Sequence, residues 1–244
     1  MSTLAPALPA VFYPSSDGER MADNTLQFEW IVTLQGNLDL LFRDDPEVFV
    51  AGDHLIYPIE GDNKTRFAPD AYVAFGRPKG HRGSYVVFAE ANIFPQVIFE
   101  VWSPSNEPEK MEVKRLQYQR YGAEEYYILY PDFPAFWRGW LRENETLVPV
   151  AQMNGFISPR LGVRFEITPG QVAIYHPNGD RFLSYLEQGV QAEEEAERAD
   201  AEHLRADSER TLKDAERVRA DAEHDRAARF ATRLRELGID PDTV

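Results

Sequence analysis

The alternation of apolar and polar positions predicts a mixture of helices and short buried strands. In residues 24–42, large apolar side chains including Leu26, Trp30, Leu34 and Leu38 recur at helical spacing, which predicts one amphipathic helix. Strands that are covered on both faces of a sheet are almost continuously apolar. Short stretches of this kind occur at 48–51, 70–75, 96–102 and 126–130.

A second helix is expected between the last two of these strands. Ser103-Pro104-Ser105 interrupts the chain, and Asn106 followed by Glu109 resembles a capping box, so we expect Asn106 as the N-cap. Gly122 is expected to end the helix. The strand at 126–130 follows at once, which predicts a right-handed β-α-β crossover with parallel strands.

The second half of the body predicts two hairpins before the composition changes. Segments 136–141 and 146–151 are expected to pair, and segments 171–175 and 181–185 are expected to pair through the tight-turn sequence Asn178-Gly179. From Glu187 onward, proline and aromatic residues nearly vanish, and Ala, Glu, Asp and Arg dominate. We therefore expect a loose leader at 1–20, one folded domain at 21–186 and a charged helical extension at 187–244.

The extension is expected to be one long helix or a coiled coil. Its bulky apolar residues are sparse, so the spacing leaves two interpretations open: a single solvated helix, or a helix that associates with a second copy. A homodimer through the body or through this helix is compatible with the sequence.

The composition limits the cellular compartment and the binding partners that we expect for the protein. The chain has no cysteine, and no apolar run approaches the roughly 18 residues of a membrane span, so we expect a soluble, cytoplasmic protein without disulfides. The formal net charge of -15 argues against broad electrostatic attraction to nucleic acid. Any such contact must be local. The clearest basic cluster of the body is the loop 76–83, in which Arg77, Lys79 and Arg82 are candidates for binding a phosphate backbone; a merely solvated loop is the alternative.

The candidate chemistry centres on two acids and a lysine. Glu100 stands in a strand of large apolar residues, where an unpaired charge is costly, so it must be protonated, paired or bound to a metal. Asp70 opens another strand. On neighbouring strands, Asp70, Glu100 and the carbonyl of Val101 would offer oxygen ligands to Mg²⁺, with Mn²⁺ as a substitute. Lys114 shares a helix face with Met111, Tyr118 and Tyr121 and is therefore expected to face the sheet.

Each residue also has a simpler interpretation. Lys114 would extend its amine into water, Glu100 would form a structural ion pair with Lys114 or an arginine, and Asp70 would belong to a turn after proline. The three residues together are more specific than any one of them. They are typical of a metal-dependent phosphodiesterase.

These residues resemble a known family. The order Pro69-Asp70, then Phe99-Glu100-Val101-Trp102-Ser103-Pro104-Ser105, then Lys114 and the run from Tyr121 to Tyr127 is similar to the Uma-type restriction endonuclease family of the PD-(D/E)XK nuclease superfamily. The resemblance implies a restriction-endonuclease-like α/β fold with a mixed central sheet flanked by helices.

The resemblance also implies a function. It assigns Asp70 and Glu100 as metal-binding acids and Lys114 as the catalytic lysine of a Mg²⁺-dependent DNA endonuclease. Trp102 replaces the lysine that the wider superfamily carries two residues after the glutamate, so Lys114 must come from the helix. Such nucleases often supply another acid from the first helix, for which Asp23 and Glu29 are candidates. The alternative function is an inactive nuclease-like scaffold that recruits partners through its acidic C-terminal helix.

Overall fold

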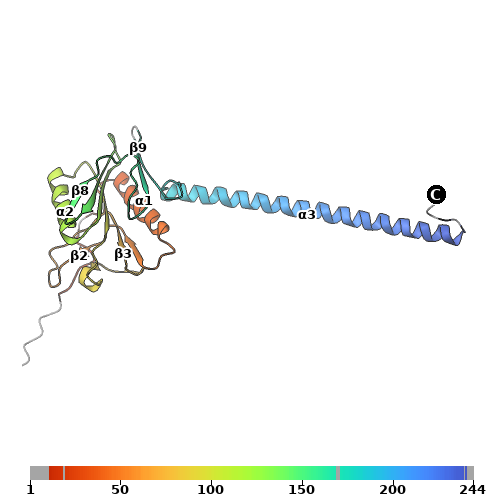
Figure 1. Ribbon diagram of the computed structural model, residues 1–244, viewed down its shortest axis with the longest axis horizontal. Helices are drawn as coiled ribbons and strands as arrows, with labels where there is room; N and C mark the ends of the chain where they lie inside the picture. Colours follow the sequence, from red (N-terminus) through yellow and green to blue (C-terminus); the bar gives the residue numbers. More distant parts are fainter. Residues whose placement is uncertain (1–10, 19, 169–170, 239, 241–244) are drawn as a thin grey trace, which may run out of the picture. The chain divides into compact units, whose positions relative to one another are not determined.

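The computed structural model of the chain describes residues 11–18, 20–168, 171–238 and 240. The chain divides into two compact units, Met1–Glu187 and Gln188–Val244. The first unit is a layered α/β body, and the second consists of most of one long helix (Figure 1).

A six-stranded mixed sheet forms the centre of the body. Its strand order is β1-β3-β5-β6-β7-β8, and β5–β6 is its one parallel pair within the described residues. The strands are β1 (Val48–Ala51), β3 (Ala71–Phe75), β5 (Val97–Val101), β6 (Glu125–Tyr130), β7 (Phe136–Glu143) and β8 (Thr146–Pro149).

Smaller elements surround the sheet. β9 (Arg164–Thr168) and β10 (Gln171–Tyr175) form an antiparallel pair, and β2 (Ile56–Tyr57) and β4 (Tyr85–Val86) form a short parallel pair. One 3-10 turn, η1 (Val87–Ala89), follows β4.

Two helices cover opposite faces of the sheet. α1 (Thr25–Leu41) places Ile31, Leu34 and Leu38 in a core cluster that includes Val97 and Phe99 of β5. α2 (Pro108–Tyr121) contributes Met111 and Tyr118 to a second cluster, which includes Ile98 of β5. Successive residues of a strand face opposite sides. Glu100, two residues after Ile98, therefore faces the α2 side.

The central β-α-β unit confirms the predicted parallel strands and the helix between them. β5 and β6 are parallel, and α2 connects them. Gly122 ends α2 with a left-handed backbone at φ +110° and donates its N–H to the Tyr118 carbonyl. The predicted start was wrong, because Glu107 is the N-cap and Pro108 opens the helix. Proline suits the first helical position, where its missing N–H has no partner to lose.

Asn106 has a different role from the predicted cap. Its Oδ1 accepts a hydrogen bond from the Ser103 backbone N–H at 2.7 Å. The side chain therefore stabilises the turn that leaves β5, one residue before the helix cap.

The second predicted hairpin is only partly present. β10 pairs with β9, and Tyr175 and Arg181 form only an isolated bridge. The tight turn at Asn178-Gly179 exists, with Gly179 at φ +95° and its N–H bonded to the His176 carbonyl. The chain then enters α3 at Tyr185, so the residues expected to form the second strand lead into a helix.

The long helical extension is confirmed as a helix. α3 (Tyr185–Glu236) contains no buried residue. Within the described residues, none of the helices combines the length and the apolar character needed to span a bilayer.

Candidate active site

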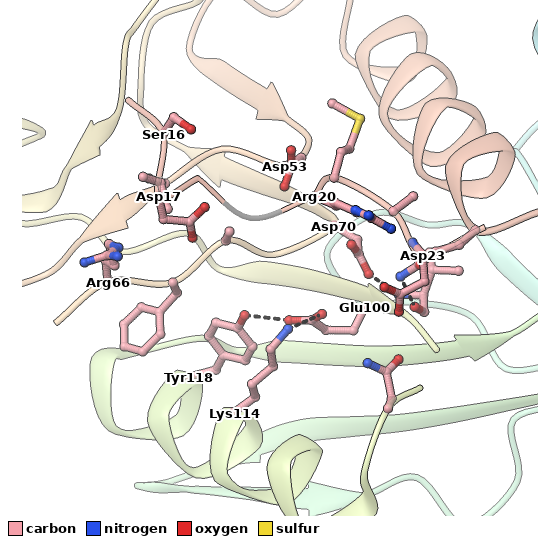
Figure 2. Close-up of a pocket in the computed structure, with 18 of the residues that line it drawn as sticks. Ser16, Asp17, Arg20, Asp23, Asp53, Arg66, Asp70, Glu100, Lys114 and Tyr118 are labelled. Atoms are coloured by element: carbon pink, nitrogen blue, oxygen red, sulfur yellow. Dashed lines mark hydrogen bonds and ion pairs between the residues drawn. The ribbon is translucent and has the colours of Figure 1, made fainter. Parts of the chain in front are cut away.

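Asp70, Glu100 and Lys114 line one cavity of about 380 Å³ in the body (Figure 2). Asp70 immediately precedes β3, Glu100 lies in β5 and Lys114 lies on α2. The structure thus brings together three residues that are distant in the sequence. Acidic side chains outnumber basic ones among the residues that line the cavity: Asp17, Asp23, Asp53, Asp70 and Glu100 against Arg20, Arg66 and Lys114.

The register of the sheet explains why the two acids meet. β3 and β5 are antiparallel, and Ala71 is paired with Phe99. Continuing this register by one residue places Asp70 opposite Glu100. Residues directly opposite each other have Cβ atoms about 4.5–5.5 Å apart and share a face of the sheet. Two carboxylates on adjacent strands are therefore held side by side.

Glu100 is held by two side chains of α2. Lys114 Nζ donates to Glu100 Oε2 at 2.8 Å, and Tyr118 OH donates to Glu100 Oε1 at 2.6 Å. Lys114 and Tyr118 are four residues apart and lie on the same face of the helix. The Glu100 side chain is only 3% exposed, whereas that of Lys114 is 38% exposed. The simpler interpretation of Glu100 expected an ion pair with Lys114, and this ion pair is present. Both of its residues line the cavity.

Asp70 is buried and strongly perturbed. Its Oδ2 accepts a hydrogen bond from the Val101 backbone N–H at 2.6 Å. Burial and the neighbouring Glu100 carboxylate raise the pKa of Asp70 well above its usual value, and Lys114 only partly offsets them. A cation between the two acids would relieve this repulsion.

The two partners of Glu100 remain protonated. Burial opposes the charge on Lys114, but the Glu100 carboxylate outweighs it and the pKa of Lys114 is raised. Burial, followed by the charge of Glu100, raises the pKa of Tyr118 well above its usual value. Lys114 is therefore a permanent cation, and Tyr118 is a hydrogen-bond donor.

The oxygen donors at this point suit a hard divalent cation. Asp70, Glu100 and the Val101 carbonyl supply oxygen only, which is the preference of Mg²⁺, and Mg²⁺ usually retains several waters. Among the described residues, no group of three or more His, Cys, Asp or Glu side chains is arranged to hold a metal. The oxygen donors that the protein could offer a metal at this point are two carboxylates and one carbonyl.

The first helix contributes an amide to this site. Gln27 Nε2 donates to the Val101 carbonyl at 2.9 Å, and Gln27 lines the cavity. Of the two candidate acids, Asp23 lines the cavity and Glu29 does not. The Asp23 carboxylate accepts hydrogen bonds from the hydroxyls of Ser103 and Ser105, which lower its pKa.

The segment before α1 forms one wall of the cavity. The first ten residues of the expected leader, and residue 19, lie outside the described part. Farther along, Tyr57 OH donates to the Pro14 carbonyl at 2.8 Å, and Tyr13 OH accepts from the Gly61 N–H at 2.7 Å. Asp17 and Arg20 line the cavity. Sequence reasoning missed these residues because the segment has no periodic pattern to place it.

Arg66 was missed for a similar reason. It belongs to a polar loop, and nothing in its local sequence separates it from other exposed arginines. Figure 2 shows it on the same wall of the cavity as Asp17. Tyr118 was recognised only as a helix-face residue, although its spacing from Lys114 was the signal for a shared partner.

The basic loop lies outside this cavity. Arg77 and Arg82 both pair with Glu90, at 2.8 and 2.5 Å, and their side chains are only 19% and 13% exposed. Lys79 pairs with Asp39 at 3.2 Å. These contacts give the three cations structural partners, and their role in nucleic-acid binding stays a prediction.

A mixed sheet with a helix on each face, carrying one acid just before β3, another on β5 and a lysine on α2, has the architecture of the restriction-endonuclease-like class of nucleases. The sequence model of the Uma2 family, described as putative restriction endonuclease, matches residues 22–204. The chain belongs to this family. The resemblance and the fold class are thereby confirmed, and the family supports a nuclease function.

Comparison with solved structures found a partly similar chain. A crystal structure described as a putative nuclease belonging to DUF820, from Anabaena variabilis, is 11% identical in sequence, with a TM-score of 0.42; the similarity covers 56% of this chain and 72% of that chain. No curated protein sequence matches this chain.

Proposed function

We propose that the protein is a Mg²⁺-dependent endonuclease that hydrolyses phosphodiester bonds in DNA. The observation that carries the proposal is the register that sets Asp70 opposite Glu100, with Lys114 bonded to Glu100 at 2.8 Å. The family to which the chain belongs supports the same reaction class.

Asp70, Glu100 and the Val101 carbonyl would hold the ion, with Mn²⁺ as a substitute for Mg²⁺. Bound there, the ion would supply an activated water and neutralise charge on the phosphoryl oxygens. Each Glu100 oxygen already accepts one hydrogen bond from α2 and keeps a second acceptor site. The α2 contacts are therefore compatible with ligation.

Lys114 and Tyr118 have distinct roles in this proposal. Lys114 stays protonated, so it cannot take a proton from water while paired with Glu100. Its partly exposed side chain lines the cavity, and its ammonium instead offers positive charge to the phosphate that enters there. Tyr118 is fully buried and positions the carboxylate.

The substrate must be bound locally because the chain is acidic. Arg20 and Arg66 line the same cavity as the two acids and can pair with phosphates flanking the cleavage site. Arg77, Lys79 and Arg82 are a second candidate surface for the DNA backbone, as the sequence predicts. Because Arg77 and Arg82 are occupied by Glu90, the arginines of the cavity are the stronger candidates.

The direct test is nicking of supercoiled plasmid DNA by purified protein in Mg²⁺, in Mn²⁺ and in EDTA. Glu100→Gln and Lys114→Met should each lower the cleavage rate by about 100-fold or more, the usual effect of removing one electrostatic group from a reaction centre. Glu109→Gln and Lys110→Met, exposed changes on the same helix, are matched controls that should cleave like the wild type. Cleavage that survives Glu100→Gln would remove the site assignment.

The rival is a nuclease-like scaffold without activity, in which the Glu100–Lys114 ion pair is only structural. Isothermal titration calorimetry with Mg²⁺ separates the two functions. A nuclease should bind Mg²⁺ and lose binding in Glu100→Gln, whereas a scaffold has no need to bind the ion.

A further inference from the structure

A seven-residue repeat runs through the middle of α3, the blue helix of Figure 1. Residues 198–225 divide into four consecutive heptads with the sequences RADAEHL, RADSERT, LKDAERV and RADAEHD. A repeat of seven in a helix returns the same residue types to the same side of a two-stranded coiled coil.

The fourth and seventh positions of the repeat form one stripe along the helix. The spacing alternates between three and four residues, which is the a and d pattern of a coiled-coil seam. The members of the stripe are Ala201, Leu204, Ser208, Thr211, Ala215, Val218, Ala222 and Asp225. In the single chain, Leu204 is 71% exposed and Val218 is 63% exposed.

The charges that flank this stripe are sorted by side. The position before each a residue, called g, is always aspartate: Asp200, Asp207, Asp214 and Asp221. The position after each d residue, called e, is arginine in three of four heptads, at Arg205, Arg219 and Arg226, with Leu212 in the fourth. One edge of the stripe is therefore negative, and the other is mostly positive.

This sorting selects one orientation of a pair of helices. In a parallel pair, each g residue meets the e residue five positions farther along the second helix, so Asp200 meets Arg205, Asp214 meets Arg219 and Asp221 meets Arg226. In an antiparallel pair, g meets g and e meets e, which opposes aspartate to aspartate and arginine to arginine. Only the parallel arrangement joins unlike charges.

The ion pairs within the helix leave these arginines available. Among the described residues, the extension forms the ion pairs Arg198–Glu194, Lys213–Glu209, Arg217–Asp214 and Arg233–Glu236. None of them includes Arg205, Arg219 or Arg226. Of the g aspartates, Asp214 is engaged within the helix by Arg217, at 3.8 Å.

We propose that residues 198–225 form a parallel, in-register, two-stranded coiled coil with a second copy of this chain. The proposal does not depend on the nuclease assignment. Small residues at the a positions allow close approach of the helices but bury little apolar area, so the association is concentration-dependent and strengthened by the charge pairs. The register ends near residue 225, because the next apolar residues, Ala227, Phe230, Leu234 and Leu237, have a shifted spacing.

Charge exchange on the full-length chain tests the interface. One variant replaces three aspartates with arginine, which makes both edges of the stripe positive: Asp200, Asp214 and Asp221. A second variant replaces three arginines with aspartate, which makes both edges negative: Arg205, Arg219 and Arg226. Each variant alone should raise the dimer dissociation constant by about 100-fold or more in sedimentation equilibrium. An equimolar mixture of the two should recover a dimer, because each edge then meets its opposite.

A control separates the interface from general charge effects. Glu202, Glu216 and Glu223→Arg changes the net charge by the same amount as the aspartate variant, but on the b positions outside the seam. It should dimerise like the wild type. Circular dichroism at 222 nm should show that all four proteins keep their helix content.

A single cysteine tests the direction, since the chain has none of its own. Leu204→Cys should form an interchain disulfide under mild oxidation in a parallel pair, where the two residues meet at the seam. In an antiparallel pair, residue 204 lies opposite a distant position and the variant should stay reduced. A wild-type chain that sediments at its own mass of 28.0 kDa at every concentration, or a Leu204→Cys dimer that never cross-links, would overturn the proposal.

Discussion

At the scale of single residues, the site depends on how each polar side chain is partnered. Glu100 is buried, yet it has a cation on one oxygen and a phenol on the other. Asp70 has only a backbone N–H on one oxygen and a second carboxylate beside it, so burial and repulsion both disfavour its charge. Because Glu100 already has a cation beside it and Asp70 does not, a bound cation would stabilise the charged form of Asp70 more than that of Glu100.

His54, which lies outside the acid pair, gives a prediction for the pH dependence of stability. Its Nε2 contacts the Arg82 carbonyl at 3.1 Å and its Nδ1 contacts Tyr72 OH at 2.7 Å. A carbonyl only accepts, so Nε2 carries the proton and Nδ1 accepts from the tyrosine. Burial lowers the pKa of His54 below 6.5, so the unfolded chain binds a proton more readily than the folded one. Stability should therefore fall as the pH drops through about 6.5.

Urea unfolding at pH 7 and pH 5 measures this effect. The wild type should lose more stability than His54→Gln over this range, because glutamine does not titrate. His81→Gln, an exposed change in the neighbouring loop, should follow the wild type. Equal pH profiles for His54→Gln and the wild type would show that His54 does not carry the effect.

At the scale of elements, α2 supplies the two side chains that hydrogen-bond to the buried Glu100 carboxylate. It follows β5 directly and packs against the face on which Glu100 lies, so one helix face delivers both Lys114 and Tyr118 to the carboxylate. Ser103 and Asn106 fix the exit from β5. The return to β6 depends on Gly122, where the helix stops.

Gly122→Ala should destabilise this element. Gly122 has φ +110°, a conformation that disfavours any side chain, so alanine should lower the free energy of unfolding by about 1 kcal/mol. Gly36→Ala is the matched control, because Gly36 lies inside α1 with no atom near its added methyl group, and there alanine should stabilise the helix by about 0.5–1 kcal/mol. Thermal unfolding of the two variants should therefore shift in opposite directions. A shift in the same direction would contradict the left-handed end of α2.

At the scale of the whole molecule, the distribution of charge limits how the chain can meet DNA. The net charge is -15, so long-range forces repel a polyanion. For the proposed cleavage of DNA, the cations that can act are those that line the cavity, and among the described residues these are Arg20, Arg66 and Lys114. Binding should therefore involve few phosphates and a shallow dependence on salt.

Arg66→Ala tests this limit. The variant should weaken binding of a short duplex, measured by fluorescence anisotropy in Ca²⁺ to suppress cleavage, and should reduce the salt slope by about 1. Lys79→Ala, in the basic loop, should leave both quantities unchanged if the cavity alone binds DNA. A loss confined to Lys79→Ala would instead assign DNA binding to the loop.

Much of the fold was predictable because local signals agreed with the final packing. Continuous apolar runs predicted β3, β5 and β6, and the short path from one strand through a helix to the next predicted the parallel pair. The second hairpin was only partly right because Asn178-Gly179 specifies a turn but not the conformation of the residues that follow Phe182. β10 pairs with β9 instead, and the chain after the turn begins α3 at Tyr185.

The sequence alone determined that an acid stands in a buried strand, that a lysine lies on the inward face of the next helix, and that a charged helical extension follows the folded body. These are properties of spacing and composition, which act within a few turns of helix or one strand. Only the tertiary structure decided that Asp70 lies opposite Glu100, because strand register is set by pairing between distant segments. It also decided that Gln27, Arg20 and Arg66 reach the same cavity, since their places depend on loops and a first helix whose packing no local pattern specifies.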